Sequence, residues 1–311
     1  MPVNTQPDTP LSLSPEVADA VTTHAPVVAL ESTLLSHGLP PGRNLEVAHR
    51  LEGVVRDAGA VPATIAVLDG IPRIGLTEVE LERVCAADSE LDKLSLRDLG
   101  PSVALGRSGA TTVASTATLA AAAGISVFAT GGLGGVHHPT PGTSVTWDVS
   151  ADLGTLANTA ILVVCSGMKS ILDIAATLEV LETHSVPVLG YRTDDFPAFY
   201  LRSSGHPVPH RVDDPAQAAA VLAAHRRFST SGMVLANPVP VEHELDREMH
   251  DRLLAEGLEL VRDRGITGAD VTPMLLEHFH TASGGASLDA NEALVLSNAG
   301  LAARVAAELA R

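Results

Sequence analysis

Apolar residues follow two patterns that alternate along this chain. Short continuous runs of Val, Leu, Ile and Ala, bounded by Gly, Pro or polar residues, are typical of buried strands. Between these runs, apolar residues recur every three or four positions, as they do on the buried face of a helix. The runs predict strands at residues 26–30, 63–68, 125–130, 161–165, 186–191 and 233–236. The periodic segments predict helices at residues 44–58, 77–86, 170–184, 216–226, 242–257 and 290–309.

This alternation favours an α/β protein with a three-layer α/β/α fold, in which helices cover both faces of a mostly parallel sheet. No repeat or linker divides residues 13–311, so we expect a single α/β domain there, preceded by a polar, proline-containing tail at residues 1–12. Ser14 directly before Pro15 marks one helix start. Residues 93–98 alternate like a strand, and residues 109–118 are expected to open a helix rich in alanine.

Composition and charge restrict the possible partners. Apolar residues make up 45% of the chain and aromatic residues only 3%, so small aliphatic side chains must build the core. The net charge of −17 argues against binding to nucleic acid or to an anionic membrane, because both require a basic face. The same negative field would repel a phosphorylated substrate. Such a small molecule would therefore need local donors, such as a lysine or a helix N-terminus.

The remaining composition signals concern the compartment. Cys85 and Cys165 lack the spacing of a disulfide framework or a zinc site, which fits a reducing cytoplasm. The first residues show no basic and apolar leader, so we expect no signal peptide. The most apolar stretch, residues 113–130, is interrupted by hydroxyl residues and a glycine. It predicts a buried helix and a strand, and no membrane span.

The chain contains only two lysines, Lys93 and Lys169. Unlike arginine, lysine can lose its proton and act as an amine nucleophile. Lys169 follows the apolar run 161–165, which makes it the candidate nucleophile; an exposed cation is the ordinary alternative for Lys93. Glu31 directly follows the run 26–30, and ligands of open α/β sheets bind at the carboxyl ends of strands. A turn acid or a helix cap is the alternative for Glu31.

Further candidates lie between these groups. The segment that begins at Gly109 would offer free amides and hydroxyls to a phosphate, although it is not a P-loop. The glycines of residues 131–135 permit close approach to a ligand, but they do not spell the dinucleotide fingerprint. If Asp148 and Asp152 lie in one helical turn, their carboxylates share a face that could bind a hard cation. A pair of acids that complement the helix dipole is the alternative.

At these positions the sequence resembles the pseudouridine-5'-phosphate glycosidase family, also called the indigoidine-synthase-A-like family, over residues 14–309. The motifs that carry the resemblance are Val28-Ala-Leu-Glu-Ser-Thr, Ser36-His-Gly, Val61-Pro-Ala-Thr-Ile-Ala, Gly109-Ala-Thr-Thr-Val-Ala-Ser-Thr, Phe128-Ala-Thr-Gly-Gly-Leu-Gly-Gly-Val-His, Asp148-Val-Ser-Ala-Asp-Leu, Lys169-Ser-Ile-Leu-Asp and Ala236-Asn-Pro. The resemblance implies an α/β/α fold, a homotrimer, and reversible cleavage of pseudouridine 5'-phosphate to uracil and ribose 5-phosphate. It also implies a divalent metal, most often Mn²⁺.

Residue by residue, the resemblance implies that Lys169 is the nucleophile, Glu31 the proton donor and Asp148 the metal ligand. The further pocket residues that it implies are the substrate contacts Lys93, Val113, Ser150, Ala151 and Asp152 and, in second rank, His137 and Asn291. The loop at residues 138–147 departs from the family pattern, because it is longer and contains prolines.

The chemistry explains why such groups are needed. Uracil leaves from carbon, so a mechanism with two carboxylates would have to expel something close to a carbanion. An acid that opens the ribose ring and an amine that adds at C1′ avoid this, since the resulting imine-type cation accepts electrons as the C–C bond breaks. This route requires a neutral Lys169 and a protonated Glu31. Two alternatives stay open: a Schiff-base aldolase for a sugar phosphate, and a non-catalytic nucleotide-binding module.

Overall fold

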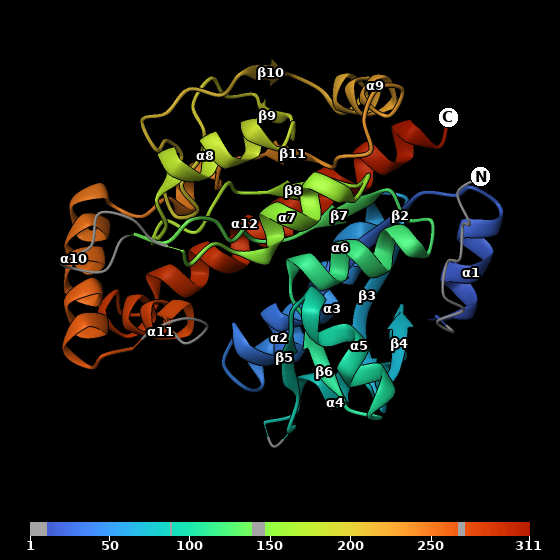
Figure 1. The fold of residues 1–311 in the computed structure, drawn as a ribbon, viewed down its shortest axis with the longest axis horizontal. Coiled ribbons are helices and arrows are strands. Elements are labelled where there is room, and N and C mark those ends of the chain that lie inside the picture. Colours follow the sequence, from blue (N-terminus) through green and yellow to red (C-terminus); the bar gives the residue numbers. More distant parts are fainter. Residues whose placement is uncertain (1–10, 88, 139–146, 267–270) are drawn as a thin grey trace.

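The structure, a computed structural model, describes residues 11–87, 89–138, 147–266 and 271–311. A twisted sheet runs through its centre, with helices on both sides (Figure 1). Within these residues the sheet has eleven strands, nine of them in the order β1-β4-β3-β2-β7-β8-β11-β9-β10. The other two lie off this path: β6 pairs with β3, and β5 pairs with β6. The strands are β1 (Ser12–Leu13), β2 (Val27–Glu31), β3 (Val61–Leu68), β4 (Ile71–Ile74), β5 (Asp92–Leu94), β6 (Gly109–Thr111), β7 (Val127–Ala129), β8 (Leu162–Cys165), β9 (Val188–Tyr191), β10 (His210–Val212) and β11 (Met233–Ala236).

The sheet is mostly parallel, as the alternation of strands and helices predicted. Only β4 and β6 run antiparallel to their neighbour β3, whereas β2, β7, β8, β11, β9 and β10 are parallel to one another. Parallel strands end at a common edge of the sheet. The residues that follow β2, β7, β8 and β11 are therefore brought together.

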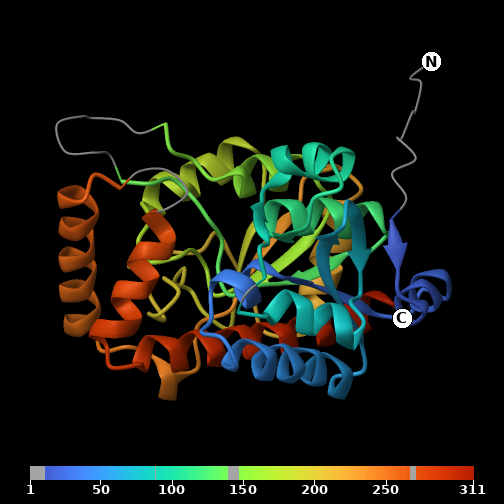
Figure 2. The ribbon, with the colours of Figure 1, turned by 90° about the horizontal axis from the view of Figure 1, so that it is seen from below.

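Helices form the two outer layers. In Figure 2, α3 and α12 lie along one face of the sheet, and α6, α7 and α8 lie along the other. The helices are α1 (Pro15–Thr22), α2 (Thr33–His37), α3 (Arg43–Asp57), α4 (Glu78–Cys85), α5 (Leu96–Ala104), α6 (Val113–Ala122), α7 (Ala151–Asn158), α8 (Ile174–Thr183), α9 (Pro215–His225), the 3-10 helix η1 (Val241–His243), α10 (Arg247–Asp263), α11 (Val271–Ala282) and α12 (Ala286–Leu309).

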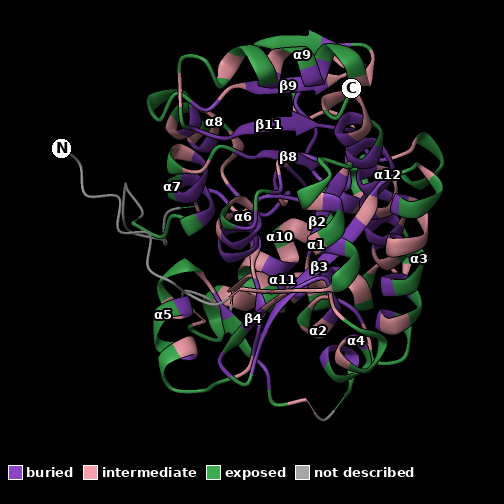
Figure 3. Ribbon diagram, turned by 90° about the vertical axis from the view of Figure 1, so that its right-hand side faces the viewer, coloured by how far each residue is buried: buried purple, intermediate pink, exposed green. Residues whose placement is uncertain are grey.

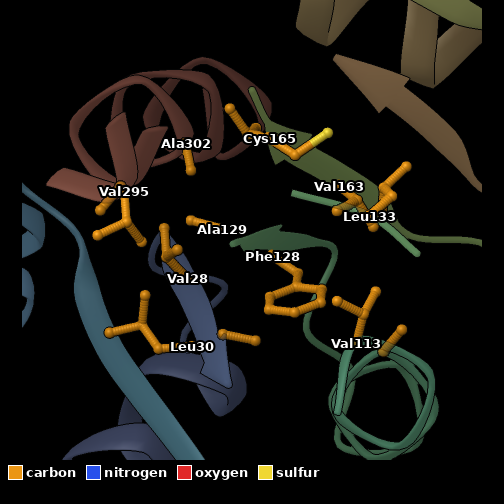
Figure 4. Close-up of a cluster of buried hydrophobic side chains, with 14 of the residues drawn as sticks. Val28, Leu30, Val113, Phe128, Ala129, Leu133, Val163, Cys165, Val295 and Ala302 are labelled. Carbon is orange, nitrogen blue, oxygen red and sulfur yellow. The ribbon is translucent and has the colours of Figure 1, made fainter. Parts of the chain in front are cut away.

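The long helix α12 lies largely within the core. It packs on α3, α9 and the strands β2, β7 and β8, and it is coloured as buried along most of its length in Figure 3. Figure 4 shows its Val295 and Ala302 against Val28 and Ala129 of the sheet. A helix that is apolar on nearly all sides is stable only when it is surrounded by other elements. Its small residues allow the strands to approach closely.

Local signals explain several helix starts. The hydroxyl of Ser14 accepts from the N–H of Val17, with Pro15 in the first turn, as predicted. Thr77 and Glu80 form a capping box at the start of α4. No helix in the described part of the chain combines the length and the apolar character that a bilayer crossing requires.

Three sequence predictions need correction. Residues 93–98 are not one strand, because β5 ends at Leu94 and α5 begins at Leu96, where Asp98 accepts from the N–H of Ser95. The helix expected to open at Gly109 begins only at Val113, after the strand β6. A Cβ at Gly109 would lie 2.6 Å from the carbonyl oxygen of Asp92, so the missing side chain is what allows β6 to pair with β5.

The third correction concerns the last hundred residues. Helix α11, which no periodic segment predicted, packs beside α10 at one end of the molecule (Figure 1). Phe279 of α11 is fully buried and stacks on Tyr200. That face of α11 therefore belongs to the core.

Candidate active site

A cavity of about 500 Å³ opens among the loops that follow β2, β5, β7 and β8. Its position at the carboxyl ends of parallel strands is the one where open α/β sheets bind ligands. The residues proposed from the sequence all line it: Glu31, Lys93, Val113, His137, Asp148, Ser150, Ala151, Asp152, Lys169 and Asn291. The fold therefore brings together groups that are distributed over most of the chain.

Glu31 is the last residue of β2, and its carboxylate accepts a hydrogen bond from the hydroxyl of Thr130. Burial raises the pKa of the Glu31 carboxyl above its ordinary value, because a low-dielectric surrounding disfavours the charged form. The positive charge of Lys169 and the hydrogen bond from Thr130 oppose this shift. The raised pKa keeps Glu31 protonated to a higher pH, which suits an acid catalyst.

Lys169 follows β8, and its side-chain amine donates to the carbonyl oxygen of Gly132 at 3.1 Å. The two main-chain segments are also bonded to each other: the N–H of Lys169 donates to Leu133, and the N–H of Leu133 donates to Gly167. The loops after β7 and β8 thus form one unit. In this unit the hydroxyl of Thr130 donates to Glu31, and the carbonyl of Gly132 accepts from Lys169. The acid and the amine are therefore bound by residues only two positions apart.

Two glycines let this unit pack against the segment that follows β9. A Cβ at Gly132 would lie 2.6 Å from the ring of Phe199. Gly167 has φ +78°, and a Cβ there would lie 1.9 Å from the carbonyl oxygen of Pro197. Any side chain at either position would push the unit away from residues 197–199.

Asp152 joins three walls of the cavity. Its carboxylate oxygens accept from the N–H of Ala114 at 3.0 Å and from the N–H of Gly134 at 2.8 Å. The side chain belongs to the first turn of α7 and the residue is only 6% exposed. Because Ala114 lies in the first turn of α6, this one carboxylate connects the starts of two helices to the glycine-rich loop.

The helices α6 and α7 both begin at the cavity. Val113 and Ala151 are their first residues, and Ser150 caps α7 by accepting from the N–H of Asp152. A helix N-terminus carries a partial positive charge and unsatisfied N–H groups, which favour an anion such as phosphate. Lys93, the middle residue of β5, contributes a cation to the same cavity. The local field can therefore oppose the negative charge of the whole chain.

Asp148 does not share a helical face with Asp152. Helix α7 begins at Ala151, so Asp148 lies in the preceding extended segment, where its carbonyl oxygen accepts from the N–H of His137. Burial lowers the pKa of the His137 imidazole, an effect that the charge of Asp148 opposes. The helical-turn interpretation of the Asp148 and Asp152 spacing is therefore wrong, although both residues line the cavity.

The donor set limits how a metal could bind. The described residues contain no cluster of three or more His, Cys, Asp or Glu side chains that could enclose an ion. Small hard cations nevertheless keep several water ligands and need only one or two carboxylates from the protein. Asp148, an exposed carboxylate at the cavity wall, fits that mode. Asp152 does not, since its oxygens already accept main-chain hydrogen bonds.

Residues 16–308 match the family model described as indigoidine synthase A like protein. The chain belongs to this family. It is similar to proteins named pseudouridine-5'-phosphate glycosidase, at 55% identity, from Salinispora tropica over 94% of this chain and 89% of that protein, and from Streptomyces griseus over 94% and 90%.

Two solved structures of the family's fold are similar over almost their whole length. One is the prealnumycin C-glycosynthase AlnA in complex with ribulose 5-phosphate, with a TM-score of 0.89, 40% identity and 98% coverage of both chains. The other is an indigoidine synthase A-like protein from Thermotoga maritima, with a TM-score of 0.84, 37% identity, and coverage of 93% of this chain and 94% of that one. These matches confirm both the family resemblance and the α/β/α fold.

In this member of the indigoidine synthase A like family, several cavity residues were not proposed from the sequence. Thr130 and Gly132 stand in a quoted motif, but no local pattern says that their hydroxyl and carbonyl face Glu31 and Lys169. The apolar part of the wall comes from α2, from other loops and from α11, and its residues include Leu34, Leu172, Phe199 and Leu276. No local pattern marks these residues as cavity positions, so only contacts distant in sequence could reveal them.

Asn291, a second-rank candidate, occupies a distinctive place in the wall. It lies on α12, is 6% exposed, and borders the cavity beside Gly131. Its side-chain oxygen has no hydrogen-bond partner among the described residues. A buried oxygen without a partner costs free energy unless a ligand supplies a donor. This family member therefore presents an acceptor for an N–H group inside the cavity.

Proposed function

We propose that this protein reversibly cleaves the C–C glycosidic bond of pseudouridine 5'-phosphate, with uracil and ribose 5-phosphate as products. The observation that carries the proposal is the attachment of one acid, Glu31, and one amine, Lys169, to the same short segment at residues 130–132. The names of the relatives and the ribulose 5-phosphate bound by the similar C-glycosynthase support the same class of substrate.

The reaction begins at the ribose ring. Protonated Glu31 transfers its proton to the ring oxygen O4′, and the bond between C1′ and O4′ breaks. The neutral amine of Lys169 then forms a bond to C1′, and the proton that the nitrogen loses returns to the Glu31 carboxylate. A covalent amine adduct of the opened sugar results.

Cleavage of the C–C bond uses the same two residues. Glu31 delivers its proton to C5 of uracil, the lone pair of the lysine nitrogen forms a double bond to C1′, and the electrons of the C1′–C5 bond stay with the base. Water then hydrolyses the protonated imine. This step releases ribose 5-phosphate, restores the amine of Lys169 and returns a proton to Glu31, so that one water is consumed in each cycle.

The other cavity residues would bind and orient the substrate. The starts of α6 and α7, at Val113 and at Ser150 and Ala151, together with Lys93, provide N–H donors and a cation for the phosphate. Asp152 holds these two helices in place through its main-chain contacts. Asn291 would accept a hydrogen bond from an imide N–H of uracil. His137 would line the sugar end of the cavity.

We also propose that Asp148 is the protein ligand of a divalent cation, with Mn²⁺ the expected metal. When bound, such an ion would supply positive charge that orients anionic groups. Asp148 would hold it through a single carboxylate, and water would complete the coordination. The homotrimer that the resemblance implies and the cytoplasmic location that the cysteine pattern suggests remain predictions.

One assay tests the proposed function and its alternatives. The purified protein is incubated with pseudouridine 5'-phosphate, with Mn²⁺ or with a chelator, and uracil is measured by chromatography. We expect uracil and ribose 5-phosphate in equal amounts, and a lower rate with chelator. Absence of uracil combined with borohydride trapping of ribose 5-phosphate would favour the aldolase. Binding without turnover or trapping would favour the nucleotide-binding module.

A further inference from the structure

A buried polar network lies directly behind the candidate active site. Its centre is Asn298 of α12, whose side chain is fully buried. The amide nitrogen donates to the carbonyl oxygen of Thr130 at 2.9 Å and lies 3.4 Å from that of Gly131 and 3.1 Å from the hydroxyl of Ser166. The amide oxygen accepts from the side chain of Asn237 at 2.9 Å.

These contacts join the ends of three neighbouring strands. Thr130, Ser166 and Asn237 directly follow β7, β8 and β11, respectively. The main chain adds two further bonds, from the N–H of Ser166 to Gly131 and from the N–H of Asn237 to Cys165. The Asn298 side chain therefore contacts both of the loops that carry the groups around Glu31 and Lys169.

The network reaches the reacting groups through the main chain that it fixes. Asn298 binds the carbonyl of Thr130, whose hydroxyl donates to Glu31. The next residues of the same segment lead to Gly132, whose carbonyl accepts from Lys169. These carbonyl oxygens cannot turn away from Asn298 without leaving part of a buried amide unsatisfied, and a buried donor without a partner costs about 1–3 kcal/mol.

We infer that Asn298 is a positioning residue, which acts on the acid Glu31 and the amine Lys169 by fixing the orientation of residues 130–132. It does not line the cavity, so it is not expected to bind substrate. The inference rests on the proposed function for its kinetic test, but a second measurement below does not require any substrate.

The variant Asn298→Asp separates positioning from packing, because the two side chains have almost the same shape. An ionised carboxylate would face the carbonyl oxygens of Thr130 and Gly131 and repel them, whereas a protonated one can donate a single hydrogen bond. The side chains that Asn298 contacts, Ser166 and Asn237, are uncharged. We expect kcat to fall about a hundredfold near neutral pH, with KM changed less than threefold, and the deficit to shrink as the pH is lowered.

A chemical probe follows Lys169 without turnover. Because the chain has two lysines, trace labelling with acetic anhydride and peptide mapping report the reactivity of Lys169 relative to Lys93. In Asn298→Asp, a loosened contact with Gly132 should raise this ratio at least threefold. The variant Asn298→Ser, which is small and uncharged, serves as the second test should the aspartate variant not fold; the same increase is expected.

Ser231→Ala is the matched control. Ser231 is also buried, and its hydroxyl bonds both to the main-chain carbonyl of Ser185 and to the imidazole of His225. It precedes β11 and therefore lies at the edge of the sheet opposite to the cavity. It should lose stability without changing the labelling ratio. Equal labelling in the parent and the Asn298 variants, or the same increase in Ser231→Ala, would overturn the inference. Failure of the parent to release uracil would overturn the proposed function alone, since the labelling result would still decide the role of Asn298.

Discussion

The side-chain amine of Lys169 donates a 3.1 Å hydrogen bond to the main-chain carbonyl of Gly132. The carbonyl is held in place because Gly132 lies against Phe199 and its segment is bonded to the loop after β8. A carbonyl oxygen accepts a hydrogen bond from an N–H of the amine, whether the amine is protonated or neutral. In the neutral amine, the lone pair takes no part in this contact and stays available for attack. This contact orients the lysine at rest, and the amine must turn from it to reach C1′ of a bound sugar.

Lys169→Arg should abolish turnover although the positive charge is kept. Arginine has no accessible neutral amine and cannot form the adduct. We expect kcat to fall by at least about a thousandfold, which corresponds to roughly 4 kcal/mol of barrier. The measurement is steady-state uracil release.

Lys93→Arg is the matched control for this experiment, since it changes the only other lysine in the same way. An arginine there keeps a cation for the phosphate, so we expect a loss of about tenfold or less, equivalent to roughly 1.4 kcal/mol. A Lys169→Arg enzyme that keeps more than a tenth of the parent activity would contradict the covalent mechanism.

The pH profile should report the protonation of Glu31. Because burial raises the pKa of this carboxyl, the acid form persists above the ordinary range of a glutamate, and kcat should decline as the pH rises through the raised value. Glu31→Gln, which cannot transfer a proton, should lower kcat by about a hundredfold to ten-thousandfold and remove this decline. Uracil release from pH 4 to 9 provides the profile.

Glu52→Gln is the control for the loss of a buried glutamate that lies outside the cavity. Burial also raises the pKa of Glu52, and a threonine, Thr64, donates to it at 2.7 Å, but Glu52 lies on α3 outside the cavity. We expect this variant to keep the alkaline decline of the parent. Loss of the decline in Glu52→Gln, or its survival in Glu31→Gln, would show that another group is the acid.

Asp152→Asn should destabilise the fold. The buried carboxylate accepts two main-chain N–H groups, whereas an amide offers one acceptor and turns its own donors toward the other N–H. A buried donor without a partner costs about 1–3 kcal/mol. Urea unfolding of the parent and the variant measures the loss, and an unchanged free energy of unfolding would contradict this role of Asp152.

Asp148→Ala should weaken the binding of Mn²⁺ and lower activity together, while the free energy of unfolding stays close to that of the parent. The exposed position of Asp148 outside α7 is the reason that the fold should tolerate the change. Titration calorimetry with Mn²⁺ measures the affinity. The comparison is Asp152→Asn, a variant that should bind Mn²⁺ as tightly as the parent. If Asp152→Asn loses affinity for Mn²⁺ and Asp148→Ala keeps it, the ion binds at Asp152.

Ribose 5-phosphate with borohydride should attach one sugar phosphate to each chain, and peptide mapping should find it on Lys169. Lys93→Met should weaken the binding of ribose 5-phosphate, since a cation for the phosphate is lost, but the label should still be found on Lys169 at saturating sugar phosphate. Label on Lys93 in the parent, or an unchanged affinity for ribose 5-phosphate in the variant, would contradict this division of roles.

The positions of Glu31 and Lys169 show how far sequence reasoning reaches. Each follows an apolar run, and buried parallel strands end at one edge of a sheet, so both were expected near a common site. The near absence of lysine elsewhere in the chain made Lys169 conspicuous. Start signals at Ser14 and Thr77 were equally readable, because a cap depends on residues only three positions apart.

Other features depended on contacts that local patterns do not encode. The spacing of Asp148 and Asp152 suggested one helical turn, but Ser150 caps α7 between them and leaves Asp148 outside. Helix α11 carries a weak local signal, since its buried face is defined by packing on α10 and Tyr200. The loop at residues 138–147, which departs from the family pattern, falls mostly outside the described residues.

By itself, the sequence determined most of the strands and helices, the apolar runs of the core and the chemical groups available at the strand ends, because these depend on periodicity and on neighbours along the chain. Only the tertiary structure decided which groups meet. Thr130 and Glu31 are 99 positions apart, and Asn298 and Thr130 are 168 positions apart. Their pairing follows from the order of strands in the sheet and from the close packing of α12 behind it, and distances of this kind arise only when the whole core is assembled.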